Sequence, residues 1–275
     1  MAVEIKLHPM ESDAHSEQND IVAVKSKTRE QVERPLSARP MGFVKHAWYL
    51  SLKSGLDFAL ALVLLALASP IILLSALLVK MTSRGSAFYT QTRVGQYGQQ
   101  FTIVKLRTMV ENCESLTGPR WAIPGDPRIT LVGQVLRITH LDELPQLVNV
   151  LRGDMSIIGP RPERPEFLPN LERQLPGYRD RLLVRPGVTG LAQVQLPADT
   201  DVESVRRKLA LDLWYVEHVN PWLDLRILLC TGLHILGVPF RIGGKLLAVP
   251  SGNALEASPE AALPETVLPR PRVAA

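Results

Sequence analysis

The sequence predicts an α+β fold: a small membrane-associated domain with an N-terminal re-entrant helix-break-helix hairpin and interfacial helices. Residues 58–79 form a run of 22 residues without a charge, which is long enough to enter a membrane. Extended stretches of alternating polarity follow this run, and segments with helical spacing of apolar residues come after them. A chain of 275 residues has room for one such domain with tails at both ends.

The two ends of the chain are predicted to be disordered tails. Residues 1–42 are polar without a sustained period, and residues 246–275 are rich in Pro and Ala without a core pattern. The first long apolar run begins only near residue 58, so we expect no cleavable signal peptide.

Charge and cysteine content exclude several functional classes. The net charge of +4 is too small for a dedicated nucleic-acid binder, but it suits an anionic membrane surface or a phosphate-bearing substrate. Cys113 and Cys230 lie far apart and form no CxxC motif. We therefore expect no disulfide, no zinc site and a reducing cytosolic setting.

The predicted membrane element covers residues 43–81, with Ser69-Pro70 near its centre. A straight helix of the 22 apolar residues would reach about 33 Å and cross a hydrocarbon core of about 30 Å. Two legs separated at Ser69-Pro70 would reach about 17 Å each, and the Ser69 hydroxyl could compensate a carbonyl freed by Pro70. Basic residues on both sides, Lys53 and Lys80 among them, favour a hairpin with both ends cytoplasmic. A proline-kinked spanning helix is the alternative.

Residues 82–245 form the predicted folded domain. Phe101 to Met109 alternates in polarity as a strand does, which would place Lys105 and Arg107 on one face. The Gly- and Pro-rich residues 111–128 are predicted to form a loop. Later elements are a helix from about Leu144 to Gly153, a short strand within 185–194, a helix over 202–218 and an apolar helix over 222–240.

The helix predicted over 222–240 is a poor spanning helix, because it carries Asp224, Arg226 and His234. It could lie in the membrane interface or under the core, and we favour the interface.

Asp142 and Glu143 are the candidate catalytic residues. Pro145 is tolerated only in the first turn of a helix, so both carboxylates should lie at a helix N-terminus. One carboxylate can bind a divalent cation while the other attacks phosphorus, and an aspartyl-phosphate is known chemistry. Taken alone, an Asp before a helix is most often an N-cap, so the dipeptide by itself favours that interpretation. His140, which precedes the pair, could act as a general base or be a structural histidine.

Basic residues are the candidate phosphate ligands. Arginine binds phosphate through a planar fork and lysine through a point charge, whereas isolated basic residues are mostly exposed surface groups. The prolines that flank Arg161 should hold its backbone still. The candidates are Lys105, Arg107, Arg137, Arg161 and Arg185.

Taken together, these stretches resemble the bacterial sugar transferases, the monotopic polyprenyl-phosphate phosphoglycosyl transferases. The resemblance covers roughly residues 48–235, and its most specific stretch is LDELPQLVNVLRGDMSIIGPRP at 141–162. The motifs KLRTM (105–109), DPRIT (126–130) and RPGVTGLAQV (185–194) follow the order and spacing of that family.

The resemblance implies transfer of a sugar 1-phosphate from a UDP-sugar to undecaprenyl phosphate, with release of UMP. Asp142 matches the nucleophile of the family and Glu143 its Mg²⁺-binding partner, so Asp142 and Glu143 form the expected metal site. Lys105, Arg137, Arg161 and Arg185 match basic positions, and Ser69-Pro70 matches the helix break. The protein would then work on the cytoplasmic face of a bacterial inner membrane, bound to one leaflet, without nucleic acid.

Two departures from the family pattern concern the donor. His140 stands where a small hydroxyl residue is common, and QLPADTDVES follows LAQV where many relatives have an Asn-Gly-Arg type of turn. The larger relatives carry further transmembrane helices, so this chain resembles the small form. The alternatives are a non-catalytic membrane-tethered binding protein and a glycosyltransferase that releases UDP.

Overall fold

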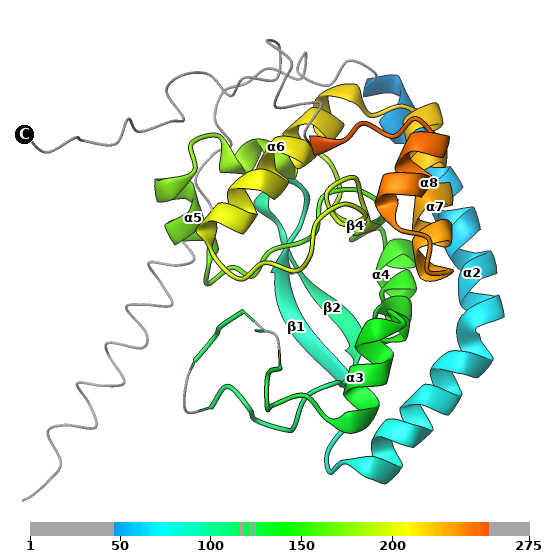
Figure 1. The fold of residues 1–275 in the computed structure, drawn as a ribbon, viewed down its shortest axis with the longest axis vertical. Helices are drawn as coiled ribbons and strands as arrows, with labels where there is room; N and C mark the ends of the chain where they lie inside the picture. Colours follow the sequence, from blue (N-terminus) through cyan, green and yellow to red (C-terminus); the bar gives the residue numbers. More distant parts are fainter. Residues whose placement is uncertain (1–46, 116–117, 122, 124, 253–275) are drawn as a thin grey trace, which may run out of the picture. The chain divides into compact units, whose positions relative to one another are not determined.

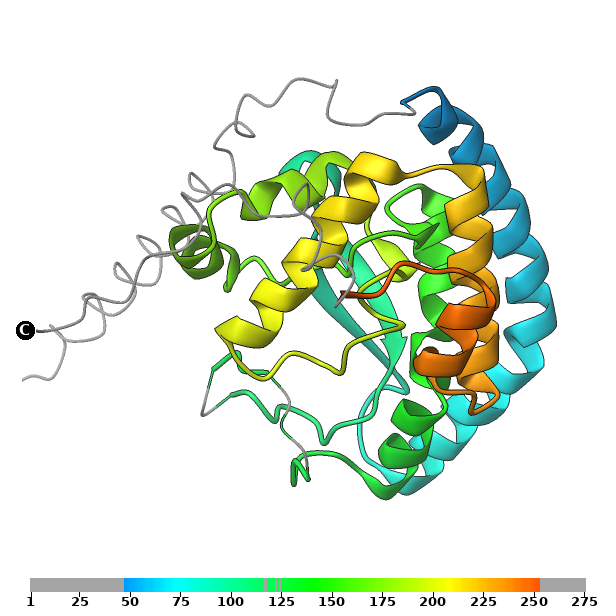
Figure 2. The same cartoon turned by 45° about the horizontal axis from the view of Figure 1, so that its top comes forward.

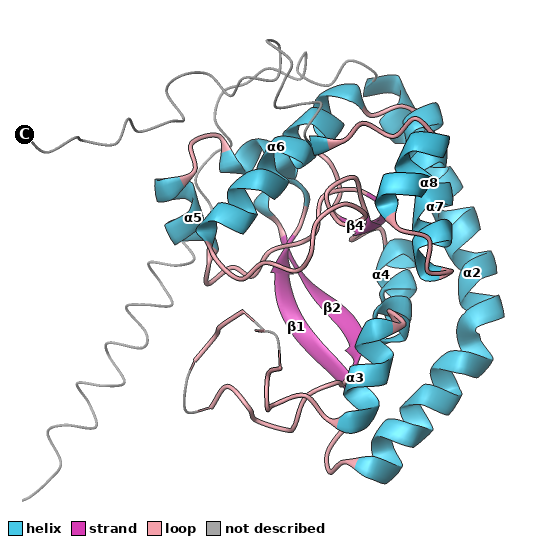
Figure 3. Ribbon diagram, in the orientation of Figure 1, coloured by secondary structure: helices cyan, strands magenta, loops and turns pink. Residues whose placement is uncertain are grey.

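The computed structural model describes residues 47–115, 118–121, 123 and 125–252 (Figure 1). These residues belong to one unit of the chain, Leu36–Ala275. The predicted tail at 1–42 lies outside the described residues, and so do residues 253–275 of the second predicted tail. The described part combines helices with two small two-stranded sheets (Figure 3), which confirms the α+β class.

The apolar run lies in α2 (Ala47–Thr82), a single helix of 36 residues that curves along its length (Figure 1). The predicted helix-break-helix hairpin is therefore not seen as two helices, because α2 continues through Ser69-Pro70. Pro70 has no N–H to donate to the carbonyl of Ala66. The Ser69 hydroxyl donates to that carbonyl at 2.9 Å, as predicted, which explains how the helix passes the proline.

Helix α2 leaves much of its apolar surface uncovered. Leu67 is 71% exposed and Leu73 is 68% exposed, although a helix in the core of a soluble protein would bury such side chains. Among the described helices, α2 alone is long and apolar enough to cross a membrane. These features are consistent with membrane association.

A β-hairpin carries the basic stretch that follows α2. Strands β1 (Phe88–Val94) and β2 (Gln100–Leu106) pair antiparallel, and Tyr89 lies opposite Lys105. Strand β2 ends earlier than the predicted Met109, so Arg107 lies beyond the strand. Between the strands, the short 3₁₀ helix η2 (Gln96–Gly98) makes the turn.

The carboxylate pair lies on a compact run of short helices. Helix α3 (Leu131–Ile138) starts at the N-cap Thr130, and the 3₁₀ helix η3 (Leu141–Gln146) follows it. Helix α4 (Leu147–Arg152) continues from η3 and ends at Gly153. The φ of Gly153 is 81°, a left-handed backbone conformation that glycine adopts without the steric cost that a side chain would add. The predicted end at Gly153 is thus confirmed, and the segment packs against α2 and β2.

A second small sheet supports the proline-rich segment after α4. Strand β3 (Ser156–Ile158) pairs in parallel with β4 (Gly187–Thr189), the short strand predicted within 185–194. Helix α5 (Leu168–Gln174) and the 3₁₀ helix η4 (Tyr178–Leu183) lie between these strands in the sequence.

Three helices complete the described structure. Helix α6 (Val202–His218) matches its predicted bounds. The helix predicted over 222–240 is wrong in extent: α7 (Pro221–Ile235) ends first, and α8 (Phe240–Leu246) is separate. The chain turns at Gly237, whose φ is 84°, and the proline two residues later cannot extend the preceding helix. Figure 2 shows α7 and α8 side by side, next to α2.

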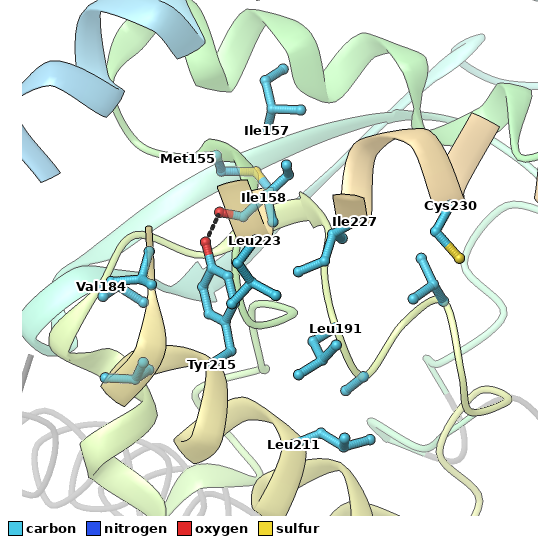
Figure 4. Close-up of a cluster of buried hydrophobic side chains, with 14 of the residues drawn as sticks. Met155, Ile157, Ile158, Val184, Leu191, Leu211, Tyr215, Leu223, Ile227 and Cys230 are labelled. Carbon is cyan, nitrogen blue, oxygen red and sulfur yellow. Dashed lines mark hydrogen bonds between the residues drawn. The ribbon is translucent and has the colours of Figure 1, made fainter. Parts of the chain in front are cut away.

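The main hydrophobic cluster joins α6 and α7 to the β3 strand (Figure 4). Met155 beside β3, Tyr215 of α6 and Ile227 of α7 are each no more than 1% exposed. This cluster fixes β3 and the chain that follows it, which leads to Arg161.

Candidate active site

Asp142 and Glu143 lie in the first turn of η3. His140, which precedes this helix, has a left-handed backbone conformation with φ 57°. His140 occupies the N-cap position and no side chain caps the helix, so Asp142 is not an N-cap here. The positive φ of His140 is uncommon for a residue with a Cβ and turns the chain sharply from α3 into η3. Both carboxylates therefore remain available for other partners.

Glu143 is the centre of a partly buried ion cluster. Lys105 Nζ lies 2.7 Å from Glu143 Oε1, and Arg161 Nη2 lies 2.6 Å from the same oxygen. Arg161 Nη1 contacts the second oxygen, Oε2, at 3.3 Å. Burial acts to raise the pKa of Glu143, but Arg161 and Lys105 outweigh it and hold the pKa well below its usual value. Glu143 is therefore a fixed negative charge.

Asp142 differs from its neighbour. Its carboxylate makes no hydrogen bond or ion pair with the described residues. Burial raises the pKa of Asp142 to about 6, and the negative charge of Glu143 adds to the effect. An oxygen that is desolvated and unengaged has free lone pairs, which a nucleophile requires.

Arg137 completes the cationic side of the site. Its charge opposes the rise in the pKa of Asp142, as do those of Lys105 and Arg161. Arg137 Nε donates to Thr108 Oγ1 at 2.8 Å, which holds the guanidinium in place. The structure thus brings Asp142, Glu143 and three of the predicted basic residues together.

The other two predicted basic residues make different contacts. Arg107 donates to the backbone carbonyls of Ser83 and Arg84, which directly follow α2. Arg185 Nη1 donates to Ser54 Oγ in α2 at 3.1 Å. In this structure both tie the folded domain to α2, and neither contacts the carboxylate pair.

Sequence reasoning missed Thr108 and Arg93. Thr108 is buried and positions Arg137, and its place in the KLRTM motif was an available signal. Arg93 Nη1 donates to the carbonyl of Pro162 at 3.1 Å, directly after Arg161. The hairpin register offers a signal for Arg93, because residues 89, 91 and 93 of β1 share a face with Lys105.

The donor set fits Mg²⁺ that also binds substrate phosphates. Within the described residues, no group of three or more His, Cys, Asp and Glu side chains could hold a metal ion. Mg²⁺ needs only one or two protein carboxylates when phosphates and water supply the rest. Oε2 of Glu143 has only one long contact, and the Asp142 carboxylate is unengaged, so both can accept a cation.

A carboxylate pair faced by three cations has the chemistry to bind a phosphate-bearing ligand, and the exposed apolar helix beside it is consistent with a membrane-associated protein. A family model described as bacterial sugar transferase matches residues 48–237. The chain belongs to the bacterial sugar transferase family.

Several curated relatives support this membership. The UDP-N-acetylgalactosamine-undecaprenyl-phosphate N-acetylgalactosaminephosphotransferase of Aeromonas hydrophila is 42% identical, and the match covers 66% of this chain and 43% of that protein. The UDP-glucose:undecaprenyl-phosphate glucose-1-phosphate transferase of Caulobacter vibrioides is 44% identical over 71% of this chain and 74% of the relative. The exopolysaccharide production protein PSS of Rhizobium leguminosarum is 38% identical, and the match covers 66% of this chain and 94% of that protein.

Proposed function

We propose that this protein transfers a sugar 1-phosphate from a UDP-sugar to undecaprenyl phosphate. The products are an undecaprenyl-diphosphate sugar and UMP, which would begin the synthesis of a bacterial polysaccharide or glycoconjugate. The names of the Aeromonas and Caulobacter relatives support this class of reaction. The observation that carries the proposal is the unengaged Asp142 carboxylate beside the Glu143 ion cluster.

The proposed reaction has two steps at Asp142. First, a carboxylate oxygen of Asp142 attacks the β-phosphorus of the UDP-sugar, and the bond from that phosphorus to the bridging oxygen breaks. UMP leaves with the bridging oxygen, and the phosphosugar remains on Asp142. Then an oxygen of the lipid phosphate attacks the same phosphorus, forms the diphosphate and frees the carboxylate.

The cations of the site stabilise charge during both steps. Arg161 and Lys105 pair with Glu143, and Arg137 is held by Thr108, so three basic side chains face the transferring phosphoryl group. Bound Mg²⁺, held by Glu143 and Asp142, would offset the charge of the diphosphate and the leaving group. EDTA should stop UMP release and added Mg²⁺ should restore it.

The protein would work at one leaflet of the cytoplasmic membrane, with its catalytic domain on the cytoplasmic face. We propose that α2 enters this leaflet and returns by bending at Ser69-Pro70. Pro70 cannot donate to the Ala66 carbonyl, and the Ser69 hydroxyl bonds to that carbonyl instead, which supports a bend at this point. Further support for membrane contact comes from exposed apolar residues of α7 and α8 and the loop that joins them. These residues include Leu229, Ile235, Leu236, Ile242 and Leu246.

The decisive experiment uses membranes or purified protein with undecaprenyl phosphate and a panel of UDP-sugars. UMP should appear with the correct donor, and Asp142→Asn should abolish it while membrane association persists. Unchanged turnover in Asp142→Asn would refute the assignment of Asp142 as the nucleophile. Release of UDP instead of UMP would indicate that the sugar is transferred without its phosphate. Mass spectrometry should detect a phosphosugar on Asp142 when the lipid acceptor is omitted.

A further inference from the structure

The four residues that end at Arg161 have their backbone held at both ends by side chains from elsewhere in the chain. At one end, Tyr215 Oη lies 3.1 Å from the carbonyl oxygen of Ile158, the dashed contact in Figure 4, and shares its single hydrogen between that oxygen and Asp224 Oδ1 at 2.8 Å. At the other end, Arg181 Nη2 donates to the carbonyl of Arg161 at 2.8 Å. The backbone from which the Arg161 side chain projects is therefore held by residues that do not touch Glu143.

The middle of this segment is fixed by backbone contacts. Gly159 N–H donates to the carbonyl of Thr189, and Gly187 N–H donates to the carbonyl of Pro160, both at 2.9 Å. The two chains approach so closely that a Cβ on Gly159 would lie 2.4 Å from the carbonyl oxygen of Arg185. The contact at the Arg161 carbonyl adds to the restraint that these backbone bonds and the two flanking prolines place on the Arg161 backbone.

Arg181 is itself held rigidly. Its Nε and Nη2 lie 3.0 Å and 2.6 Å from Asp212 Oδ2, and its Nη1 donates to Tyr178 Oη at 2.7 Å. Arg181, Asp212 and Tyr178 are all at most 6% exposed. A buried guanidinium with this many partners has a fixed orientation. The second N–H of Nη2, which does not bind Asp212, therefore points at the Arg161 carbonyl.

Helix α6 supplies both supports. Asp212, which holds Arg181, and Tyr215, which holds the Ile158 carbonyl, lie three residues apart on one face of α6. A shift of α6 would therefore move both ends of the segment together.

We propose that Arg181 is a positioning residue, which aims the Arg161 guanidinium at Glu143 and the transferring phosphate through the Arg161 carbonyl. Asp212 and Tyr215 of α6 are its structural support. The kinetic consequence rests on the proposed sugar-phosphate transfer, whereas the placement of Arg161 can be tested without it.

Arg181→Lys tests the proposal in the full-length protein. The lysine can keep the ion pair with Asp212, but one ammonium cannot reproduce the fork that also reaches the Arg161 carbonyl. We expect kcat/KM for UMP release to fall about 10-fold in a protein that still folds, although the buried partners that lose a donor should lower its thermal unfolding midpoint. The matched control is Arg179→Lys in the same 3₁₀ helix, whose guanidinium pairs with Glu172 and should leave activity unchanged.

A double-mutant cycle separates positioning from general structural damage. If Arg181 acts through Arg161, adding Arg181→Lys to Arg161→Ala should change the remaining activity by less than about two-fold. Losses that add in full would overturn the proposal. So would wild-type kcat/KM in a well-folded Arg181→Lys protein.

Hydrogen exchange gives a readout that does not depend on turnover. Peptides covering residues 158–165 should exchange faster in Arg181→Lys, while peptides of α5 should exchange as in the wild-type protein. If the wild-type protein released no UMP from any UDP-sugar, the proposed function would fail, and faster exchange at 158–165 would still support the positioning role. Unchanged exchange there would refute that role.

Discussion

Arg161 holds Glu143 through both of its carboxylate oxygens, with Nη2 2.6 Å from Oε1 and Nη1 3.3 Å from Oε2. This contact makes two adjacent carboxylates chemically different. Glu143 is kept ionised by its cations, whereas Asp142 has no such partner and a pKa raised to about 6. The pair can thus divide the work between a fixed charge and a nucleophile.

The first prediction concerns the second cation on Glu143. Lys105→Met keeps the length of the side chain but removes the charge 2.7 Å from Glu143 Oε1. We expect kcat/KM for UMP release to fall at least about 100-fold, because a preorganised cation at a phosphoryl-transfer site is lost. Arg161 still balances Glu143, so the protein should remain folded. Arg152→Met removes an exposed positive charge and serves as the control; an equal loss there would contradict the prediction.

The second prediction concerns the attachment of α2 to α7. Lys53 Nζ lies 2.6 Å from Asp224 Oδ2, and both side chains are less than 10% exposed. Lys53→Met would leave the buried Asp224 carboxylate with hydroxyl donors only, those of Tyr49 and Tyr215. We expect a loss of about 3 kcal/mol in the free energy of unfolding, measured by denaturant titration in detergent.

The control for this measurement is Glu203→Gln on α6. Glu203 pairs with Arg206 at 3.2 Å, but its side chain is 67% exposed. Removing this pair should change the unfolding midpoint very little, because solvent screens it. Equal effects of Lys53→Met and Glu203→Gln would show that the Lys53 contact does not stabilise the attachment of α2.

The sequence predicted most of the site because its key residues lie in short motifs. Asp142 and Glu143 stand before a proline that limits the helix start, and Arg161 lies between prolines, so their local conformations were restricted by neighbours in sequence. Lys105 was predicted from strand alternation. Its actual partner, Glu143, is 38 residues away, and no local pattern could indicate that contact.

The missed features depend on contacts between distant segments. Arg107 looked like a phosphate ligand because it follows Lys105 by two residues, but β2 ends at Leu106 and Arg107 turns to the end of α2. No sequence pattern pointed to a role for Arg181, because the sequence does not distinguish a buried arginine from an exposed one. Its role depends on Asp212, which lies 31 residues later on α6.

The third prediction compares two glycines within helices. A Cβ on Gly133 of α3 would lie 2.0 Å from the carbonyl oxygen of Thr108, whereas a Cβ on Gly232 of α7 would meet nothing within 4 Å. Gly133→Ala should therefore destabilise the protein by more than about 2 kcal/mol and reduce activity, since Thr108 holds Arg137. Gly232→Ala should stabilise it by about 0.5–1 kcal/mol through helix propensity. Thermal unfolding of both variants tests this, and a stable Gly133→Ala protein would contradict the close packing of α3.

The last prediction concerns the topology of α2. Pro70 leaves the Ala66 carbonyl without its helical N–H, and the Ser69 hydroxyl replaces that donor at 2.9 Å. Pro70→Ala restores the helical hydrogen bond and permits a straight helix, whose 22 uncharged residues would reach about 33 Å and cross the bilayer. If wild-type α2 re-enters one leaflet, an N-terminal tag should be protease-sensitive only from the cytoplasmic side. In Pro70→Ala, part of the population should expose the tag on the far side, whereas Ser69→Ala, which keeps the proline, should retain the wild-type pattern. A tag found on the far side in the wild-type protein would show that α2 spans the membrane.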